Sequence, residues 1–173
     1  MKRPFLFASF ALVVSQLWMS VLGCEASFLP WYWKTYEHPT YRFSLAIPRS
    51  WKSELAGVMG AVAVFVASGK EEVFRPNVNV VVQTRDPKKS LKEEGFLSVR
   101  QLSLLLDEYK LLSEAPTRLG NLEAYELRGV YRAAEGQRII RTILAFSDGR
   151  EYVFTFTCRE EQEISLQPLV KKI

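Results

Sequence analysis

Three alternating segments joined by short glycine-containing loops dominate the second half of the chain. Hydrophobic and polar residues alternate over 122–131, 138–146 and 151–158, and residues 134–137 and 147–150 connect these segments. Alternation with a period of two is typical of strands that bury one face, and loops of this length join neighbouring antiparallel strands. The sequence therefore predicts an antiparallel meander, and with it a protein built on a sheet.

The first half of the chain predicts further strands. Residues 41–47 alternate up to Pro48, which ends the pattern, and residues 61–68 form a continuous apolar run rich in valine. Such a run is typical of a central strand buried on both faces. Residues 77–83 place Val78, Val80 and Val82 on one side of another strand, and residues 112–117 form a short one.

Two helices are expected. Ser90 followed by Glu93 forms a capping box, the usual start of a helix. Hydrophobic residues then recur at helical spacing, at Phe96, Val99, Leu102, Leu106 and Tyr109. We interpret this apolar stripe as the face that covers the sheet. Residues 160–173 predict a terminal helix.

The N-terminus has the three-part layout of a secretory signal. Lys2 and Arg3 precede an uncharged apolar run over residues 5–22, and the small Gly23 stands before Cys24. The ending, Val-Leu-Gly-Cys, resembles the lipobox of bacterial lipoproteins. In that family the signal is removed before the cysteine, whose thiol receives a diacylglycerol and whose freed amine receives an acyl chain such as palmitate. The resemblance implies a signal peptide over residues 1–23, cleavage between Gly23 and Cys24, and a lipid anchor on Cys24.

Two alternatives to the lipid anchor remain open. The apolar run approaches the length that spans a bilayer, so it is also compatible with an uncleaved signal anchor. Ordinary secretion would instead leave Cys24 free to oxidise. The chain has 2 cysteines, and if Cys24 is acylated the other, Cys158, is expected to be a buried apolar thiol.

Residues 24–40 are crowded with aromatic side chains. Because aromatic rings suit the headgroup region of a membrane, Trp31, Tyr32 and Trp33 are candidates for membrane contact in a lipidated tether. The alternative is that these rings cover an edge or a face of the domain, which we expect to begin at residue 41.

The order of elements is similar to that of a known family. The similarity rests on YRFSLAIP at 41–48 with Trp51, NVNV at 77–80, LGNLEAY at 119–125 and DGREYVF at 148–154. Together these resemble the PsbP family of photosystem II extrinsic subunits and its bacterial relatives, including DcrB-like lipoproteins, over residues 41–173. The resemblance implies an α+β fold in which an antiparallel β-sheet is flanked by helices on both faces, an α/β/α sandwich. It also implies a non-catalytic role at a membrane surface.

Residues suited to catalysis or metal binding are scarce. His38 is the single histidine, which excludes sites that need two imidazoles. The chain has neither a Gly-x-Ser-x-Gly motif nor a glycine-rich phosphate loop. The acidic pairs Glu71-Glu72, Glu93-Glu94 and Asp107-Glu108 are expected at turns or on helix surfaces, where solvated charge is the usual state. We therefore predict no catalytic residue, no metal and no cofactor.

Basic residues suggest one binding patch but no nucleic-acid site. Without Lys2 and Arg3 the chain has 21 basic residues against 19 acidic ones, too small an excess to indicate nucleic acid. Arg128, Arg132 and Arg138 lie on two neighbouring strands, and they form a cationic patch if they face the same way. The alternative is that they protect a sheet edge from aggregation.

These observations favour a lipid-anchored extracytoplasmic accessory protein of the bacterial cell envelope, held on a membrane and facing the periplasm or the exterior. Its expected partner is another envelope protein or membrane complex, whose effective concentration rises when both are held at one membrane. A module that binds a lipid or another apolar ligand between sheet and helix is the alternative, and it requires a cavity there. An enzyme would require acidic side chains that converge in a cleft.

Overall fold

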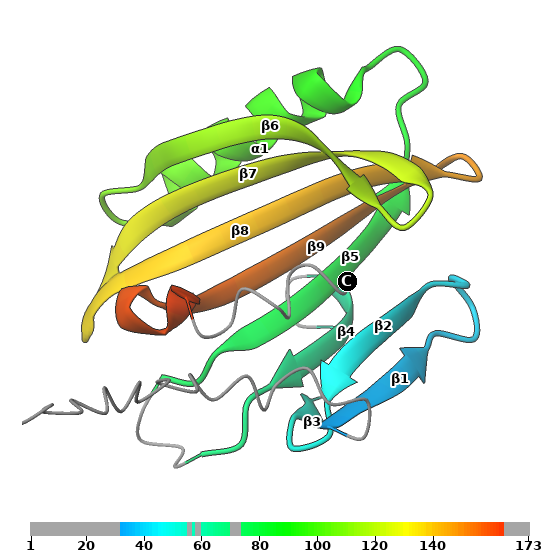
Figure 1. Ribbon diagram of the computed structural model, residues 1–173. Coiled ribbons are helices and arrows are strands. Elements are labelled where there is room, and N and C mark those ends of the chain that lie inside the picture. The colour runs from blue at the N-terminus through cyan, green and yellow to red at the C-terminus, as the bar shows by residue number, and fades with distance from the viewer. Residues whose placement is uncertain (1–31, 55–56, 58–59, 70–73, 165–173) are drawn as a thin grey trace, which may run out of the picture.

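A single large sheet organises the residues that the computed structural model describes, which are 32–54, 57, 60–69 and 74–164 (Figure 1). Its strands are antiparallel and run in the order β3-β4-β5-β9-β8-β7-β6. They are β3 (Lys52–Glu54), β4 (Ala61–Val66), β5 (Asn77–Thr84), β6 (Lys110–Leu119), β7 (Leu122–Ala133), β8 (Gly136–Ser147) and β9 (Arg150–Arg159). The expected antiparallel meander is confirmed as β7-β8-β9, and β6 extends it by one strand.

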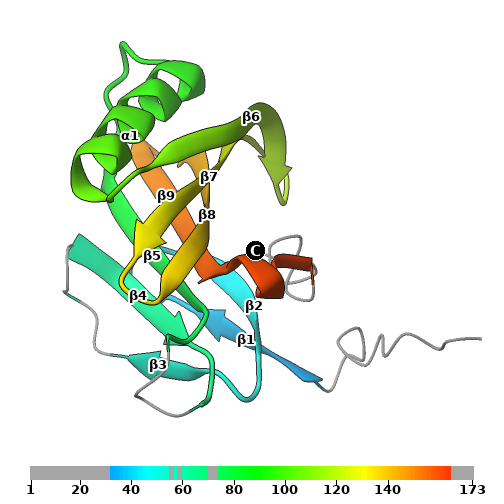
Figure 2. The ribbon, with the colours of Figure 1, turned by 90° about the vertical axis from the view of Figure 1, so that its left-hand side faces the viewer.

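The two faces of this sheet are covered differently. The helix α1 (Leu91–Leu105) packs on one face, and the hairpin of β1 (Trp33–Glu37) and β2 (Ser44–Pro48) covers part of the other (Figure 2). The 3₁₀ turn η4 (Glu160–Gln162) follows β9 on the hairpin side. The α+β class is therefore confirmed, but helices on both faces are not, because α1 is the one complete α-helix among the described residues. Residues 165–173 of the expected terminal helix lie outside the described residues. Within the described part of the chain, no helix is long and apolar enough to cross a membrane.

The strand expected over residues 41–47 is part of a hairpin whose first strand, β1, was not predicted. β1 lies within the range assigned to the tether, and it pairs with β2 from Trp33 opposite Pro48 to Glu37 opposite Ser44. Trp33 and Tyr36 pack against the main core. This part of the aromatic stretch therefore belongs to the folded domain and covers one of its faces, which is the alternative that the sequence left open.

The main core lies between the hairpin and the sheet. Alternate residues of β9 point to this side, and they meet Leu45 and Ile47 of β2, each 1% exposed. The buried residues of this cluster are Phe43, Leu45, Ile47, Trp51, Ala63, Phe65, Val78, Val80, Ala124, Ile139, Ile143, Ala145, Tyr152, Phe154, Phe156 and Cys158. Because β9 is the middle strand of seven, its apolar side chains form the centre of this core.

The helix side of the sheet has a smaller core. The capping box at the start of α1 is confirmed, since the Glu93 backbone N–H donates to Ser90 Oγ at 3.3 Å and the Ser90 N–H donates to Glu93 Oε2 at 2.8 Å. The close contact to the sheet is made at Gly95, where a Cβ would lie 2.8 Å from Cδ1 of Tyr125. Phe96 was expected to face the sheet, but it is 61% exposed because α1 turns its glycine, and not the neighbouring ring, toward β7.

A second glycine allows a ring to lie against β7. Tyr109, which follows α1, packs over the backbone of Gly129, so that a Cβ at Gly129 would lie 2.5 Å from Cε2 and 2.7 Å from Cζ of the ring. Real Cβ atoms do not approach a ring carbon this closely, and the ring is partly buried. The helical spacing in the sequence predicted Tyr109 as part of the helix, but the residue lies after the end of α1 and packs on the sheet from there.

Gly129→Ala is therefore expected to destabilise the domain by about 1–3 kcal/mol, the usual cost of overpacking a well-filled site. Urea denaturation monitored by tryptophan fluorescence measures the free energy of unfolding. Gly69→Ala is the matched control, because a Cβ there meets nothing closer than Arg75 at 3.6 Å. A cost at Gly129 that persists in a Tyr109→Ala background would contradict this explanation.

Candidate functional site

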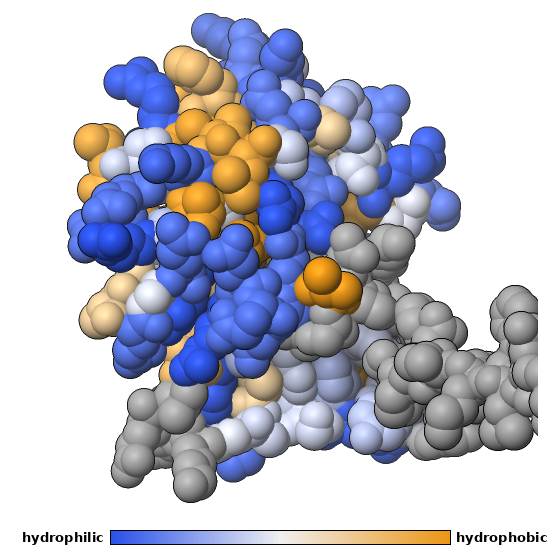
Figure 3. All heavy atoms as spheres, turned by 60° about the vertical axis from the view of Figure 1, so that its left-hand side comes forward, coloured by the Kyte–Doolittle hydropathy of each residue, from blue (hydrophilic) through white to orange (hydrophobic). Residues whose placement is uncertain are grey.

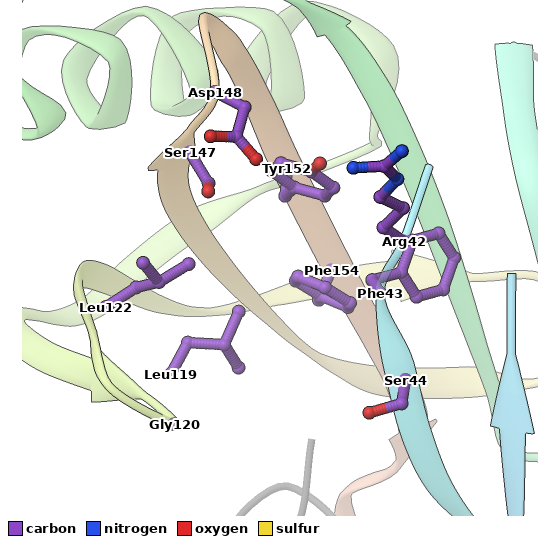
Figure 4. Close-up of a pocket in the computed structure, with 10 residues that line it drawn as sticks. All are labelled: Arg42, Phe43, Ser44, Leu119, Gly120, Leu122, Ser147, Asp148, Tyr152 and Phe154. Atoms are coloured by element: carbon purple, nitrogen blue, oxygen red, sulfur yellow. The ribbon is translucent and has the colours of Figure 1, made fainter. Parts of the chain in front are cut away.

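A cleft lies on the hairpin side of the sheet, where three connections come together. It has a volume of about 370 Å³ and is bordered by the start of β2, the turn between β6 and β7, the turn between β8 and β9, and the middle of β9 (Figure 4). Its lining residues are Arg42, Phe43, Ser44, Leu119, Gly120, Leu122, Ser147, Asp148, Tyr152 and Phe154. We call it the hairpin cleft.

The floor of the hairpin cleft is aromatic and rigidly held. Phe43 packs edge-on against Tyr152 and Phe154 of β9, with ring centroids 6.3 and 6.0 Å apart. The Tyr152 hydroxyl donates a hydrogen bond to the Tyr41 carbonyl oxygen at 3.0 Å. These contacts fix the end of the hairpin on the sheet. Leu119 and Leu122 form the opposite wall, and Leu122 is 36% exposed.

The turn between β1 and β2 places Arg42 at the rim. The His38 N–H donates to the Phe43 carbonyl at 2.9 Å and the Arg42 N–H donates to the His38 carbonyl at 3.0 Å. The His38 ring accepts from the N–H groups of Thr40 and Tyr41 through Nδ1, at 3.2 and 3.3 Å. Arg42 has a φ of 56°, a left-handed conformation that is costly for a residue with a side chain. His38 therefore shapes this turn, and no metal-binding cluster occurs among the described residues.

Charge is concentrated at the rim of the hairpin cleft. Arg42 and Asp148 are exposed, and neither forms an ion pair with another described residue. Arg150 lies close by, with its guanidinium 5.4 Å from the centre of the Tyr41 ring. An apolar floor with unpaired charges at its edge suits the binding of a ligand that has both apolar and charged groups.

The three arginines singled out in the sequence do not form one patch. Arg128 and Arg132 lie on the hairpin side of β7, whereas Arg138 stands opposite Tyr131 and points to the helix side. Arg138 is 1% exposed, bound to Glu135 at 2.8 Å and placed 4.4 Å from the centre of the Phe74 ring. Because the register sets the face on which each side chain lies, a single cationic surface is excluded.

The other two arginines have acidic partners. Arg128 makes two hydrogen bonds of 2.5 Å to the Glu163 carboxylate and holds the pKa of that carboxyl below its ordinary value. Arg132 pairs with Glu108 at 3.2 Å, and both are exposed. The cross-strand neighbour of Arg128 is Arg141, which is bound to Glu126. Local pairing thus neutralises most of this charge.

A buried carboxyl on the helix side is absent from the sequence-based prediction. Glu151 is 2% exposed and accepts a hydrogen bond from Gln83 Nε2 at 2.8 Å, and its burial raises the pKa of the carboxyl. Glu94, expected to be solvated, is 9% exposed and lies 3.1 Å from Lys89. The pairing of Gln83 with Glu151 depends on the β5–β9 register, which no local motif encodes. A space of about 420 Å³ between α1 and the end of β5 is lined mainly by polar residues, so it does not suit the apolar ligand expected between sheet and helix.

The remaining candidates lie at the N-terminus. Gly23, Cys24 and Trp31 lie outside the described residues. Tyr32 is 52% exposed, whereas Trp33 is partly buried against the core. Exposed leucines also occur at the end of α1 and the start of β6, and hydrophobic surface is visible on this side (Figure 3). Leu104, at 85% exposure, is the most exposed of them.

The thiol of Cys158 is expected to be inert in the folded chain. It is 0% exposed, and burial raises its pKa from 9.0 to about 12. In a Cys24→Ala chain, a disulfide reagent at pH 8 should modify this thiol only when the domain unfolds, because the thiolate is the reactive form. Stability should also fall as pH rises from about 9 toward 12, because the unfolded thiol ionises first. Modification within the mixing time in the absence of urea would contradict the buried state.

Comparison with protein families matches residues 43–170 to the family described as DcrB. Among solved structures, the cyanobacterial PsbP of Synechocystis sp. PCC 6803 is similar with a TM-score of 0.65 and 11% identity, over 82% of this chain and 91% of that one. LpqN of Mycobacterium tuberculosis, described as involved in cell envelope biogenesis, has a TM-score of 0.60 and 14% identity, over 82% and 86%. The Ran-binding protein Mog1p of Saccharomyces cerevisiae has a TM-score of 0.56 and 18% identity, over 81% and 93%. At these identities the likeness shows a shared fold. No curated protein matches the sequence.

Proposed function

Because the chain belongs to the DcrB family and has the PsbP-like fold that its sequence predicted, we propose that it is a lipid-anchored accessory protein of the bacterial cell envelope. In this proposal Cys24 carries the anchor, and the folded domain binds a protein partner, without catalysis, through the hairpin cleft. The proteins of similar fold support this class of role, since one is described as involved in cell envelope biogenesis and another as binding Ran.

The observation that carries the proposal is the composition of the hairpin cleft. Its aromatic floor and leucine wall offer apolar contact, and its rim carries Arg42 and Asp148, neither of which forms an ion pair with another described residue. Protein interfaces commonly combine an apolar centre with a polar rim. The lining has no cysteine or histidine that would serve as a nucleophile or general base. These groups suit recognition of a partner.

The position of Cys24 explains how an anchor would assist binding. β1 begins at Trp33, nine positions after Cys24. Even when fully extended, this stretch reaches at most about 30 Å. The domain would stay within that distance of the membrane, so a membrane partner would be met at a high effective concentration.

Photo-crosslinking in bacterial cells tests the cleft. A photoreactive amino acid replaces Leu122 at the wall of the cleft or, as the matched control, Leu104 on α1, which is exposed and far from the cleft in the fold. We expect Leu122 to give a discrete crosslinked protein in the membrane fraction, and we expect an added Leu119→Glu substitution to reduce its yield at least fivefold. Equal yields at Leu104, or no crosslink at Leu122, would exclude the cleft as the binding site.

A further inference from the structure

The strand β2 has one open edge. It pairs with β1 on one side, and no strand in the described part of the chain pairs with its other side. In the close-up, β1 lies on one side of β2 and the hairpin cleft on the other (Figure 4). The backbone groups on this open edge therefore face the cleft.

The hydrogen bonds of the hairpin identify these groups. In an antiparallel pair, residues that bond to the neighbouring strand alternate with residues whose N–H and C=O point away from it. The N–H of His38 bonds to the carbonyl of Phe43, so Leu45 and Ile47 also bond to β1, by their register with Tyr36 and Lys34. It follows that the N–H and C=O groups of Ser44 and Ala46 point to the open edge.

We propose that an extended segment of the partner protein pairs with this edge as a third strand of the β1–β2 sheet. The segment would place an apolar side chain in the hairpin cleft, on Phe43 and Phe154, and an acidic side chain beside Arg42. Strand addition combines backbone hydrogen bonds, which give affinity, with side-chain pockets, which give specificity. This inference rests on the proposed binding role of the cleft, and it names the form of the partner.

The charge of Arg42 and the apolar surface of the cleft both favour a segment of a partner protein as the occupant of the β2 edge. Arg42 is exposed and unpaired among the described residues, and its left-handed backbone holds it at the rim. An acidic residue of the partner segment would supply the negative charge that pairs with Arg42. The cleft also has apolar surface that a segment added to β2 would cover, since Leu119 and Leu122 stand across from Ser44.

The two edge strands of the large sheet, unlike β2, carry residues that hinder pairing with a further strand. The edge strand β6 contains Pro116, which has no N–H to donate, and it carries Lys110, Glu114 and Arg118. Proline and charged residues are the usual protection of an edge strand against pairing. The opposite edge strand, β3, has three residues, two of them charged. By contrast, the residues of β2 are uncharged, and proline stands at its end.

Hydrogen exchange of the full chain in detergent tests whether the edge is free. The amides of Ser44 and Ala46 should exchange quickly, while those of Leu45 and Ile47 should be protected by their bonds to β1. Protection of Ser44 and Ala46 in the chain alone would overturn the proposal. If that protection depends on chain concentration, a second copy occupies the edge, and if it does not, another segment of the same chain does.

Peptide binding tests the strand itself. A displayed library of nonapeptides is selected on the full chain, and the enriched peptide is synthesised with a fluorescent label. We expect apolar residues at alternate positions with an acidic residue at one flank, and we expect the peptide to protect the Ser44 and Ala46 amides. A form of the peptide with alternate amides N-methylated keeps every side chain but cannot form the ladder, so it should bind at least tenfold more weakly. Equal affinity would overturn strand addition.

Variants of the chain complete the test. Ala46→Pro removes an outward N–H that is not bonded to β1, and it should weaken peptide binding at least tenfold, whereas Ala46→Val keeps the N–H and should bind as well as the unchanged chain. Thermal melting checks that both variants fold. Arg42→Glu should weaken binding by a similar factor. If the Leu122 crosslink in cells persists while Ala46→Pro has no effect on it, the cleft binds a partner by other contacts and only the strand model fails.

Discussion

Replacing Phe156 with alanine is expected to reduce the free energy of unfolding by about 3–5 kcal/mol, the usual cost of removing a buried aromatic ring. Phe156 is 2% exposed and belongs to β9, the middle strand of seven. Its strand neighbours are Val78 on β5 and Arg141 on β8. A cavity at this position would lie in the centre of the main core, where surrounding strands are held on both sides and relax little.

Urea denaturation of the chain measures this effect. Because total stabilities of domains are about 5–15 kcal/mol, the alanine variant risks partial unfolding. Phe156→Leu removes fewer buried atoms and provides a milder change with a smaller expected cost. Leu104→Ala is the surface control, with an expected change within about 0.5 kcal/mol, since Leu104 is 85% exposed. Equal costs for Phe156→Ala and Leu104→Ala would show that the core is not centred on β9.

Replacing Cys24 with alanine is expected to release the protein from the membrane. A lipobox cysteine is the single attachment point of its acyl chains, and each buried CH₂ contributes about 0.8 kcal/mol to membrane binding. The unchanged chain should fractionate with membranes, and its intact mass should correspond to a chain that begins at Cys24 and carries acyl groups. The variant should lack these groups and appear in the soluble fraction.

A second cysteine gives the matched control for this experiment. Cys158 is buried, so Cys158→Ala should leave both lipidation and membrane association unchanged. An unchanged chain that keeps residues 1–23 and carries no acyl group would contradict the lipid anchor and favour an uncleaved signal anchor. Secretion of a chain that begins elsewhere would favour ordinary signal cleavage.

The sequence predicted most of the sheet because its signals are local. The glycine loops at 134–137 and 147–150 and the alternation around them define β7, β8 and β9. The capping box at Ser90 marks the start of α1 to the residue. Propensity and periodicity act over a few residues, so they identify strands and helix ends well.

The sequence predicted less about what the elements contact. For the aromatic stretch the sequence left two interpretations open, contact with a membrane and cover of the domain, and composition alone does not decide between them. Trp33 and Tyr36 pack against the main core, so for these two residues the second interpretation applies. Phe96 matched the helical period, but the absence of a side chain at Gly95 lets α1 approach Tyr125 and decides which side of the helix meets the sheet. Tertiary packing, and not the local pattern, decides both cases.

The hairpin cleft was not predictable from one-dimensional signals. Most of its residues come from around positions 42, 120 and 148, and the sequence around each position predicts no more than an ordinary turn. The three turns meet because β2 packs over β9 and because the meander returns two of its turns to the same end. Arg128, Arg132 and Arg138 show the reverse, since their spacing suggested one surface and the strand register separates them.

The placement of β9 has a consequence for the order in which the protein can fold. β5 pairs with β9, although α1 and three further strands stand between them in the chain. The ribosome makes β9 last among the described strands, so the sheet has a gap at its centre until β9 has been made. Pairing between strands so far apart in the sequence is slow, because the chain loses the entropy of loop closure before the strand contacts stabilise the sheet. Under the secretion that we propose, this late closure delays folding until β9 is made, and an unfolded chain is the form that a secretion channel accepts.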